Sequence, residues 1–264
     1  MTAQEVSLAN QTSENKPFRV DCKAALKPLI PMLIPLKSSD SFLPLLAAPK
    51  VTAISSQVSP WFSHLAYPLG RYLVLPSYFG QIEVTGREHL PTSGPIILAP
   101  THRSRWDSFM VPYAAGRDII GRELRFMVSA DEMKGLQGWI VQQFGGFPVN
   151  TRHPSISCLR HGVDLLCNGE ALVIFPEGGI YRDNNPHQLK PGLARLALQA
   201  ETSHPGLGIK VVPIKIDYSD PYPHWGSQVK IRISQPLLVS DYLQIPTKQS
   251  AQQMLVDLAA VFQE

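Results

Sequence analysis

Cysteine is scarce in this chain, and long apolar runs are missing. The 264 residues include three cysteines, Cys22, Cys158 and Cys167, and no C-x-x-C pair, which argues against a disulfide framework and against a zinc ribbon. No uninterrupted apolar run approaches the ~20 residues that a membrane-spanning helix needs. Residues 1–15 are polar and carry acids, so we expect no signal peptide.

Charge is also sparse, and its balance excludes some partners. Asp, Glu, Lys and Arg make up 17% of the residues, whereas 44% are hydrophobic, so wholesale disorder is excluded. The net charge of +3 is too small to indicate a nucleic-acid partner. It suits a phosphate-bearing substrate or an anionic membrane surface. A chain of this length forms one generous domain or two small ones.

Proline separates the beginning of the chain from the rest. It cuts the apolar stretches within residues 1–57, where we expect a partly disordered N-terminal extension. Ser59 followed by Pro60 then predicts the start of an amphipathic helix over residues 60–75, kinked at Pro68. Its apolar side chains share an arc of roughly 120°: Trp61, Phe62, Leu65, Leu69, Tyr72 and Leu73. This face either packs on the core or lies in a membrane interface, where Trp and Tyr are common.

Strand-like and helix-like patterns alternate from residue 81 onward. Strands are predicted at residues 81–85, 95–99, 124–129, 147–149, 171–175, 210–216 and 228–233. Helices are predicted at residues 104–115, 131–143, 155–167, 189–203 and 247–262. The alternation predicts a single α/β domain over residues 58–264, with a mixed, mostly parallel sheet flanked by helices. Pro213 interrupts a predicted strand, so we expect that strand at an edge or a bulge.

The end of the second predicted strand carries the most informative residues. His102 follows this strand directly, and Asp107 comes five positions later. On a regular helix two such side chains are about 140° apart and cannot meet. If His102 lies in the turn before the helix, its ring can reach the carboxylate and become a general base suited to neutral pH. The alternative is a helix with Ser104 as its N-cap and a histidine without function.

Three further segments are candidates for ligand binding; one contains a short predicted strand, one follows a predicted strand and one opens a predicted helix. Residues 145–152 combine two glycines with Arg152, a residue type that binds phosphate. Glu177 follows the strand at residues 171–175, where it is placed either to accept hydrogen bonds from substrate hydroxyls or to anchor a neighbouring loop. Lys190 opens a helix and is placed to hold an anion together with the helix N-terminus. Taken alone, each segment is equally explained by ordinary loop structure.

Taken in order, these motifs resemble those of the glycerophospholipid acyltransferase family, and in particular its bacterial members that acylate 1-acyl-glycerol-3-phosphate. The family pattern Asn-His-x-Ser-x-x-Asp corresponds here to residues 101–107, and Phe-Pro-Glu-Gly-Thr corresponds to residues 175–179. The glycine-led segment that ends at Arg152 and the Val212-Pro213 pair also fit. The resemblance covers roughly residues 80–215, and its specificity comes from four motifs in the right order.

Three positions depart from the family pattern. Thr101 stands where the family has Asn, and Gly179-Ile180 stands where it commonly has Thr-Arg. Arg182 is therefore a candidate replacement for the missing arginine. Arg152 lies slightly outside its common register. These departures concern the acceptor headgroup rather than the histidine and aspartate chemistry.

The resemblance implies direct acyl transfer. His102 would take the proton from a glycerol hydroxyl as it attacks an acyl thioester, and Asp107 would orient His102 and stabilise the imidazolium. Arg152 and Lys190 would hold the acceptor phosphate, and Glu177 would bind the glycerol or order its loop. The substrate-binding residues implied in full are Ser104, Arg105, Arg152, Glu177, Gly178, Gly179 and Lys190. The resemblance implies no metal and no other cofactor.

The implied partners are an acyl-carrier protein or acyl-coenzyme A as donor and lysophosphatidic acid as acceptor. The protein would bind peripherally to the cytoplasmic face of a membrane. Two alternatives stay open: a different acceptor, such as glycerol-3-phosphate or another lysolipid, and a non-catalytic peripheral lipid-binding protein. A serine hydrolase is disfavoured because the chain has no Gly-x-Ser-x-Gly elbow.

Overall fold

The computed structural model describes Ser56 and residues 58–150, 155–183, 185, 187–244 and 247–263. Apart from Ser56, the extension predicted for residues 1–57 lies outside these residues. Ser56 itself is buried. Its hydroxyl lies 2.8 Å from the His161 ring, and its carbonyl accepts a hydrogen bond from Arg125. The described part of the chain therefore begins against side chains from two distant segments.

A mixed sheet forms the centre of the molecule, with the strand order β1-β7-β6-β2-β5-β3-β4, and β8 pairs with β6. The strands are β1 (Gln81–Thr85), β2 (Ile96–Pro100), β3 (Leu124–Ser129), β4 (Gly146–Val149), β5 (Ala171–Val173), β6 (Lys210–Tyr218), β7 (Gln228–Ile233) and β8 (Leu237–Leu238). From β6 to β4 all neighbouring pairs are parallel, whereas β7 and β8 run antiparallel to β6. The mostly parallel sheet predicted from the alternating pattern is confirmed.

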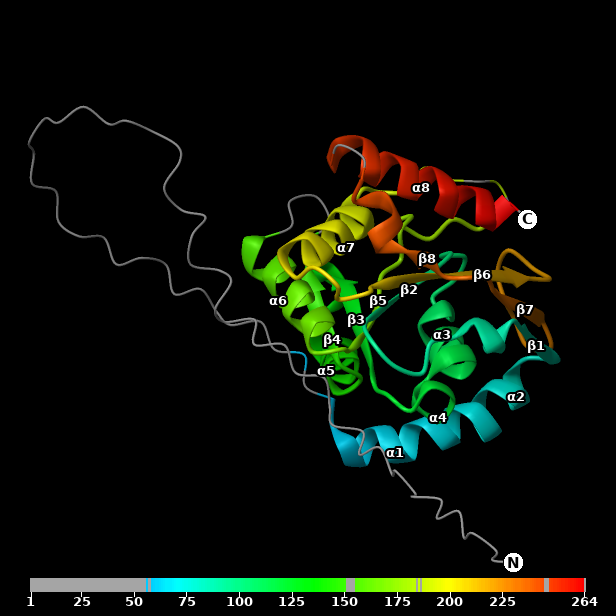
Figure 1. The fold of residues 1–264 in the computed structure, drawn as a ribbon. Coiled ribbons are helices and arrows are strands. Elements are labelled where there is room, and N and C mark those ends of the chain that lie inside the picture. Colours follow the sequence, from blue (N-terminus) through cyan, green and yellow to red (C-terminus); the bar gives the residue numbers. More distant parts are fainter. Residues whose placement is uncertain are drawn as a thin grey trace, which may run out of the picture.

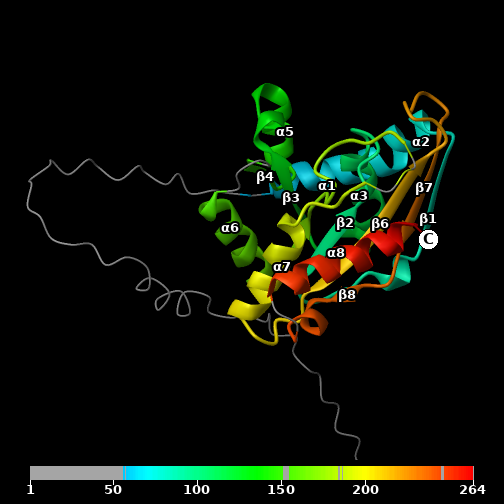
Figure 2. The same cartoon turned by 90° about the horizontal axis from the view of Figure 1, so that it is seen from above.

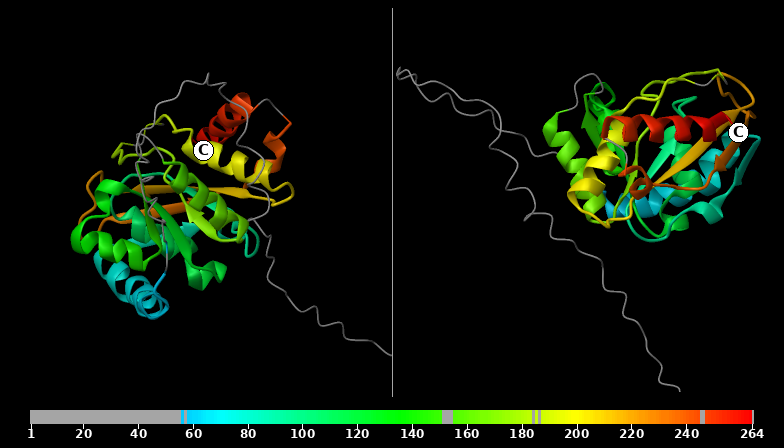
Figure 3. Two further views of the ribbon diagram at one scale, coloured as in Figure 1. Left: turned by 90° about the vertical axis from the view of Figure 1, so that its left-hand side faces the viewer. Right: turned by 45° about the horizontal axis from the view of Figure 1, so that its top comes forward.

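Helices cover both faces of the sheet (Figures 1 and 3). One face carries α1 (Pro60–Leu69), α2 (Leu75–Tyr78), α3 (Asp107–Ala115) and α4 (Arg117–Ile120), and the other carries α6 (Ile156–Cys167), α7 (Gly192–Ser203) and α8 (Thr247–Gln263). Strand β2 shows how alternate residues of one strand pack into the cores on the two faces of the sheet. Ile96 and Leu98 pack into the core beneath α3, whereas Ile97 and Ala99 pack into the core beneath α7 and α8. All four are fully buried, as expected of a parallel strand covered on both sides.

Helix α5 (Gly135–Gln143) precedes the edge strand β4 and projects from the sheet (Figure 2), and its Trp139 ring contacts Phe62 of α1. The 3-10 turn Ala130–Glu132 precedes it, so this helix starts later than the residue 131 that the sequence predicts. The remaining 3-10 turns are Arg87–His89 and Val239–Tyr242. Short elements such as α4 and β8 were not predicted, because two to four residues give no measurable periodicity.

The N-terminal helix turns its apolar face outward. A π-helical turn, Gly70–Val74, joins α1 to α2 shortly after Pro68, in keeping with the missing proline N–H. The predicted apolar arc is exposed, with 69% of Trp61, 62% of Leu65 and 74% of Tyr72 accessible. Phe62 alone in the arc is half-buried, with its ring against Phe144 and Trp139. The prediction that the arc packs on the core is therefore wrong for its other five residues. The inner face of α1 is held by the hydrogen bond that Ser63 donates to Glu123 and by the ring contact of Tyr67 with Phe144.

No helix among the described residues combines the length and apolar character required to cross a bilayer.

Pro213 lies inside the sheet, so the edge position predicted for its strand is wrong. Strand β6 is flanked by β2 on one side and by β7 and β8 on the other. The β7 ladder begins at Ile214 and the β8 ladder ends at Val211. Pro213 falls between them, and its carbonyl accepts a hydrogen bond from Ser234 in the connection between the two partners. Proline has no N–H to donate, and at this position neither the β7 ladder nor the β8 ladder uses one.

Candidate active site

His102 and Asp107 meet at the carboxyl end of β2. The N–H of Thr101 donates to the Ile214 carbonyl over 2.9 Å and extends the pairing with β6 by one residue. The chain then leaves the sheet, and α3 begins only at Asp107. His102 therefore lies in a turn before the helix. Its Nδ1 lies 2.9 Å from Asp107 Oδ2, the arrangement that the spacing allows only for a histidine outside the helix.

Asp107 is fully buried and surrounded by donors. Its Oδ2 accepts the backbone N–H of Arg103 over 2.6 Å and that of Ser104 over 2.8 Å. Its Oδ1 accepts the Tyr218 hydroxyl over 2.7 Å. Because Asp107 accepts hydrogen bonds from all of these donors, it also accepts one from the imidazole. In the neutral ring Nδ1 therefore carries the proton, and Nε2 carries the free lone pair.

Ser104 does not cap the helix as predicted, because the helix begins three residues later. Its hydroxyl accepts a hydrogen bond of 3.3 Å from the Trp106 N–H, and its own N–H is taken by Asp107. Ser104 is buried and lies outside the lining of the cavity next to His102. The structure therefore places it behind the site, where it supports the turn.

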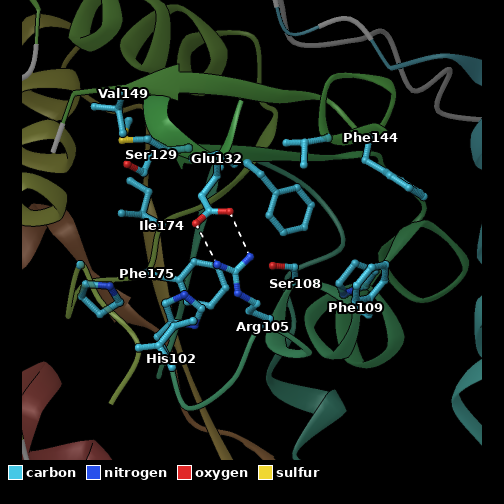
Figure 4. Close-up of a pocket in the computed structure, with 18 of the residues that line it drawn as sticks. His102, Arg105, Ser108, Phe109, Ser129, Glu132, Phe144, Val149, Ile174 and Phe175 are labelled. Carbon is cyan, nitrogen blue, oxygen red and sulfur yellow. Dashed lines mark hydrogen bonds and ion pairs between the residues drawn. The ribbon is translucent and has the colours of Figure 1, made fainter. Parts of the chain in front are cut away.

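The imidazole of His102 packs against Phe175, with ring centroids 4.2 Å apart. Its side chain is 18% exposed and lines a large cavity (Figure 4). Among the described residues, none forms a hydrogen bond to Nε2. The ring thus has one nitrogen fixed by Asp107 and the other accessible from the cavity.

Glu177 ties the turn of His102 to the loop after β5. Its carboxylate accepts two hydrogen bonds of 2.8 Å from the Arg103 guanidinium and one of 2.7 Å from the His102 N–H. In return, the His102 carbonyl accepts the N–H of Tyr181 over 2.8 Å. Glu177 is only 2% exposed and lies outside the cavity lining. Of the two roles that the sequence left open for it, the geometry matches the loop anchor.

The cavity beside His102 measures about 1230 Å³. It exceeds the roughly 300–1,000 Å³ common for drug-sized ligands. Its walls are mainly apolar and come from β3, α5 and the loop after β5; they include Phe126, Val128, Ile140, Phe144, Ile174 and Phe175. Arg105 also lines it and is paired with Glu132 over 3.3 Å (Figure 4). A cavity of this size and polarity suits a long hydrocarbon chain.

Besides Arg105, three exposed basic side chains line the same cavity: Arg182, Lys190 and Arg195. None of them is within ion-pair distance of a carboxylate in the described part of the chain. Arg182 lies 4.8 Å from the Tyr222 ring centroid. Lys190 and Arg195 flank the first turn of α7, whose free N–H groups add positive potential. These groups together can hold an anion.

Gly178 and Gly179 also line the cavity. Gly178 has φ +67°, and a Cβ at this position would lie 2.6 Å from the Lys190 side chain. The glycine therefore allows the loop to turn in a left-handed conformation and lets Lys190 approach its backbone. Arg152, the other predicted phosphate ligand, lies outside the described residues.

Sequence reasoning missed Tyr218 and Arg195 and left Arg182 open. Tyr218 is close to Asp107 only because β6 extends past β2, and burial together with the Asp107 charge raises the pKa of its hydroxyl. The hydroxyl is therefore protonated and available as a donor. Arg195 lies five positions after Lys190, which itself precedes α7, and this spacing gives no shared helical face, so no local pattern indicated the pair.

Residues 81–217, just over half of the chain, match the sequence model of a family described as Acyltransferase. The chain belongs to the acyltransferase family. This family of enzymes agrees with the resemblance found in the motifs, and the matched residues include both His102 and Asp107.

Named relatives of this acyltransferase chain have low identity. A 1-acyl-sn-glycerol-3-phosphate acyltransferase of Bacillus subtilis is 25% identical over 67% of this chain and 83% of its own length. The glycerol-3-phosphate O-acyltransferase 1 of Saccharomyces cerevisiae is 32% identical over 38% of this chain, which spans only 14% of that protein. The chain spans about half, 51%, of a Streptococcus pneumoniae 1-acyl-sn-glycerol-3-phosphate acyltransferase at 24% identity.

A solved structure shares the fold. The 1-acyl-sn-glycerophosphate acyltransferase PlsC of Thermotoga maritima superposes with a TM-score of 0.51 over 71% of this chain and 77% of its own. The identity of 17% makes this a likeness of fold. The single α/β domain observed here is thus an architecture already found among acyltransferases.

Proposed function

We propose that this acyltransferase moves a fatty acyl group from a thioester, carried by acyl-carrier protein or coenzyme A, to the free hydroxyl of 1-acyl-glycerol-3-phosphate. The observation that carries the proposal is the His102–Asp107 pair, with its free Nε2 directed at a large apolar cavity that has a basic rim. The names of the Bacillus and Streptococcus relatives support the same acceptor.

The geometry supports a direct transfer with His102 as general base. The acceptor hydroxyl gives its proton to Nε2 while its oxygen attacks the thioester carbonyl carbon, and Asp107 stabilises the imidazolium that forms. The tetrahedral intermediate then re-forms the carbonyl and expels the thiolate, which takes the proton back from Nε2. Ester and free thiol are the products, and no acyl-enzyme is needed.

The cavity divides the two ends of the substrates between different walls. The apolar walls from β3 and α5 suit acyl chains, and the rim of Arg182, Lys190 and Arg195 suits a phosphate. Arginine and lysine bind phosphate through charge-assisted hydrogen bonds. Arg152 remains a proposed phosphate ligand on the strength of the motif alone.

Glycerol-3-phosphate is the second candidate acceptor, favoured by the name of the yeast relative, which is 32% identical over the matched segment. It shares the phosphate but lacks an acyl chain. It would therefore use the basic rim of the cavity and leave more of the apolar wall to the donor.

A membrane surface is the proposed location of the enzyme, and its cytoplasmic face remains a prediction. The outer face of α1 and the π-helical turn presents exposed Trp61, Leu65, Leu69, Tyr72 and Leu73. Helix α5, whose Trp139 contacts Phe62 of α1, presents Leu136 and Trp139. Exposed apolar and aromatic side chains on helices of this kind lie well in a membrane interface.

The test supplies purified full-length protein with a radiolabelled acyl thioester and a panel of acceptors: lysophosphatidic acid, glycerol-3-phosphate and lysophosphatidylcholine. Product from lysophosphatidic acid alone supports the proposal, and preference for glycerol-3-phosphate transfers it to the second candidate. Lipid binding without any product would instead show a non-catalytic lipid-binding protein.

His102→Ala tests the role of the imidazole within that assay. Loss of a general base lowers the rate by ~10²–10⁴, so turnover should fall by that factor while the circular-dichroism spectrum is unchanged. His224→Ala is the matched control, because His224 also lies near a carboxylate, 3.6 Å from Asp220, but outside the cavity lining. Equal activity of the two variants would contradict the proposed base.

A further inference from the structure

Tyr218 reaches Asp107 because β6 is longer than β2. The N–H of Ile216 donates to the Thr101 hydroxyl over 2.9 Å, so a side chain continues the pairing after the β2 ladder has ended. Tyr218 lies two residues further along β6 and therefore points to the same face as Ile216, toward the start of α3. Its hydroxyl then donates to Asp107 Oδ1 over 2.7 Å.

The two oxygens of Asp107 are held in different ways. Oδ2 accepts three N–H groups, from the His102 ring and from the backbone of Arg103 and Ser104. Among the described residues, Oδ1 accepts only the Tyr218 hydroxyl. Because Asp107 is fully buried, no bulk water replaces that hydroxyl, and its loss would leave a carboxylate lone pair without a partner.

Resting on the acyl transfer proposed above, we propose that Tyr218 is a positioning residue that fixes the plane of the Asp107 carboxylate and, through it, the orientation and basicity of His102. The hydroxyl also draws charge away from the carboxylate. Burial and the Asp107 charge keep the pKa of Tyr218 above its usual value, so this group donates throughout the pH range of an assay.

Removal of the hydroxyl has two physical consequences. The carboxylate can rotate, so His102 spends less time in its productive orientation and kcat falls. The carboxylate also keeps more of its charge, which stabilises the imidazolium and moves the acid limb of the pH–rate profile to higher pH. The other charged groups are the Arg103–Glu177 pair beside His102 and the groups that line the same cavity: Arg71, Arg105, Asp118, Glu132, Arg182, Lys190 and Arg195. The substitution changes none of them.

The chain contains a matched control. Tyr242 donates to Asp257 Oδ2 over 2.8 Å, a hydrogen bond of the same type beside α8 and outside the cavity lining. Tyr218→Phe and Tyr242→Phe each remove one such hydroxyl. We expect Tyr218→Phe to lower kcat about ten-fold or more, with KM for the acceptor unchanged and the acid limb shifted, whereas Tyr242→Phe leaves all three unchanged.

A second measurement does not depend on turnover. The ring nitrogens of His102 are followed by ¹⁵N NMR against pH in the full-length protein without substrate, and the His102→Ala spectrum assigns the signal. The titration midpoint should move to higher pH in Tyr218→Phe but not in Tyr242→Phe. An unchanged midpoint overturns the positioning role. A shifted midpoint in a protein without acyltransferase activity upholds the coupling and overturns only the proposed reaction.

Discussion

The buried Arg103–Glu177 pair gives a quantitative test of how the site is held together. The two side chains are 10% and 2% exposed, and Glu177 also accepts the His102 N–H. Removing one partner of a buried ion pair costs about 3–5 kcal/mol, because the other charge is left without compensation. At roughly 2–4 °C per kcal/mol for a domain of this size, Glu177→Ala should lower Tm by roughly 6–20 °C.

An exposed ion pair that lines the cavity is the control. Arg105 and Glu132 are 68% and 42% exposed, and such pairs contribute roughly 0–1 kcal/mol. Glu132→Ala should therefore lower Tm by less than about 4 °C. Both variants are followed by circular dichroism during heating of the full-length protein. A Tm of Glu177→Ala within about 4 °C of the wild type would refute the reasoning that Glu177 anchors the loop.

A double variant separates the charge from the anchor. Replacing both partners by apolar residues, Arg103→Met with Glu177→Leu, removes the uncompensated charge and should recover most of the lost stability. It does not restore an acceptor for the His102 N–H. Recovered Tm with activity still below that of the wild type is the expected result, and full recovery of both would limit Glu177 to a charge-balancing role.

Two further substitutions test the membrane face and the turn at Lys190. Leu69→Glu should lower binding to anionic vesicles about ten-fold or more, since burial of a leucine side chain contributes about 1.5–3 kcal/mol, whereas Val256→Glu, exposed on α8, should leave sedimentation with vesicles unchanged. Gly178→Ala and Gly206→Ala each place a Cβ at positive φ and should cost about 1–2 kcal/mol in thermal unfolding. Only Gly178→Ala should also raise KM for the phosphate acceptor, because only that Cβ displaces Lys190.

The fold was predictable where the pattern is local and long. Strand β2 is a continuous apolar run, and α6 begins at Ile156, directly after Ser155, whose hydroxyl caps the helix by accepting the Cys158 N–H. The outward face of α1 was not predictable in the same way. An apolar arc has the same period whether it faces a core or a membrane, and the direction was decided by Ser63 and Arg71, whose polar contacts with Glu123 and Asp118 hold the opposite face.

The same distinction between local and long-range contacts applies to the site. The contact between His102 and Asp107 depends on five neighbouring residues and on where a helix begins, so sequence spacing was enough to state the condition for it. The contacts of Glu177 with Arg103 and of Tyr218 with Asp107 join residues 74 and 111 positions apart. Such pairs are set by strand order and register, which no local pattern in a single sequence encodes.

The same register explains how the chain tolerates Thr101 where the family pattern has Asn. The Thr101 hydroxyl accepts the Ile216 N–H, so this residue serves the sheet rather than the cavity, whose lining does not include it. Its methyl group and hydroxyl suit a buried position beside a strand. This hydrogen bond also holds β6 where it extends past β2, and thereby helps to place the Tyr218 hydroxyl. Thr101 departs from the family motif and Tyr218 lies just beyond the matched residues 81–217. Thr101, through β6, and Tyr218, directly, thus act on the Asp107 carboxylate, which orients the His102 imidazole.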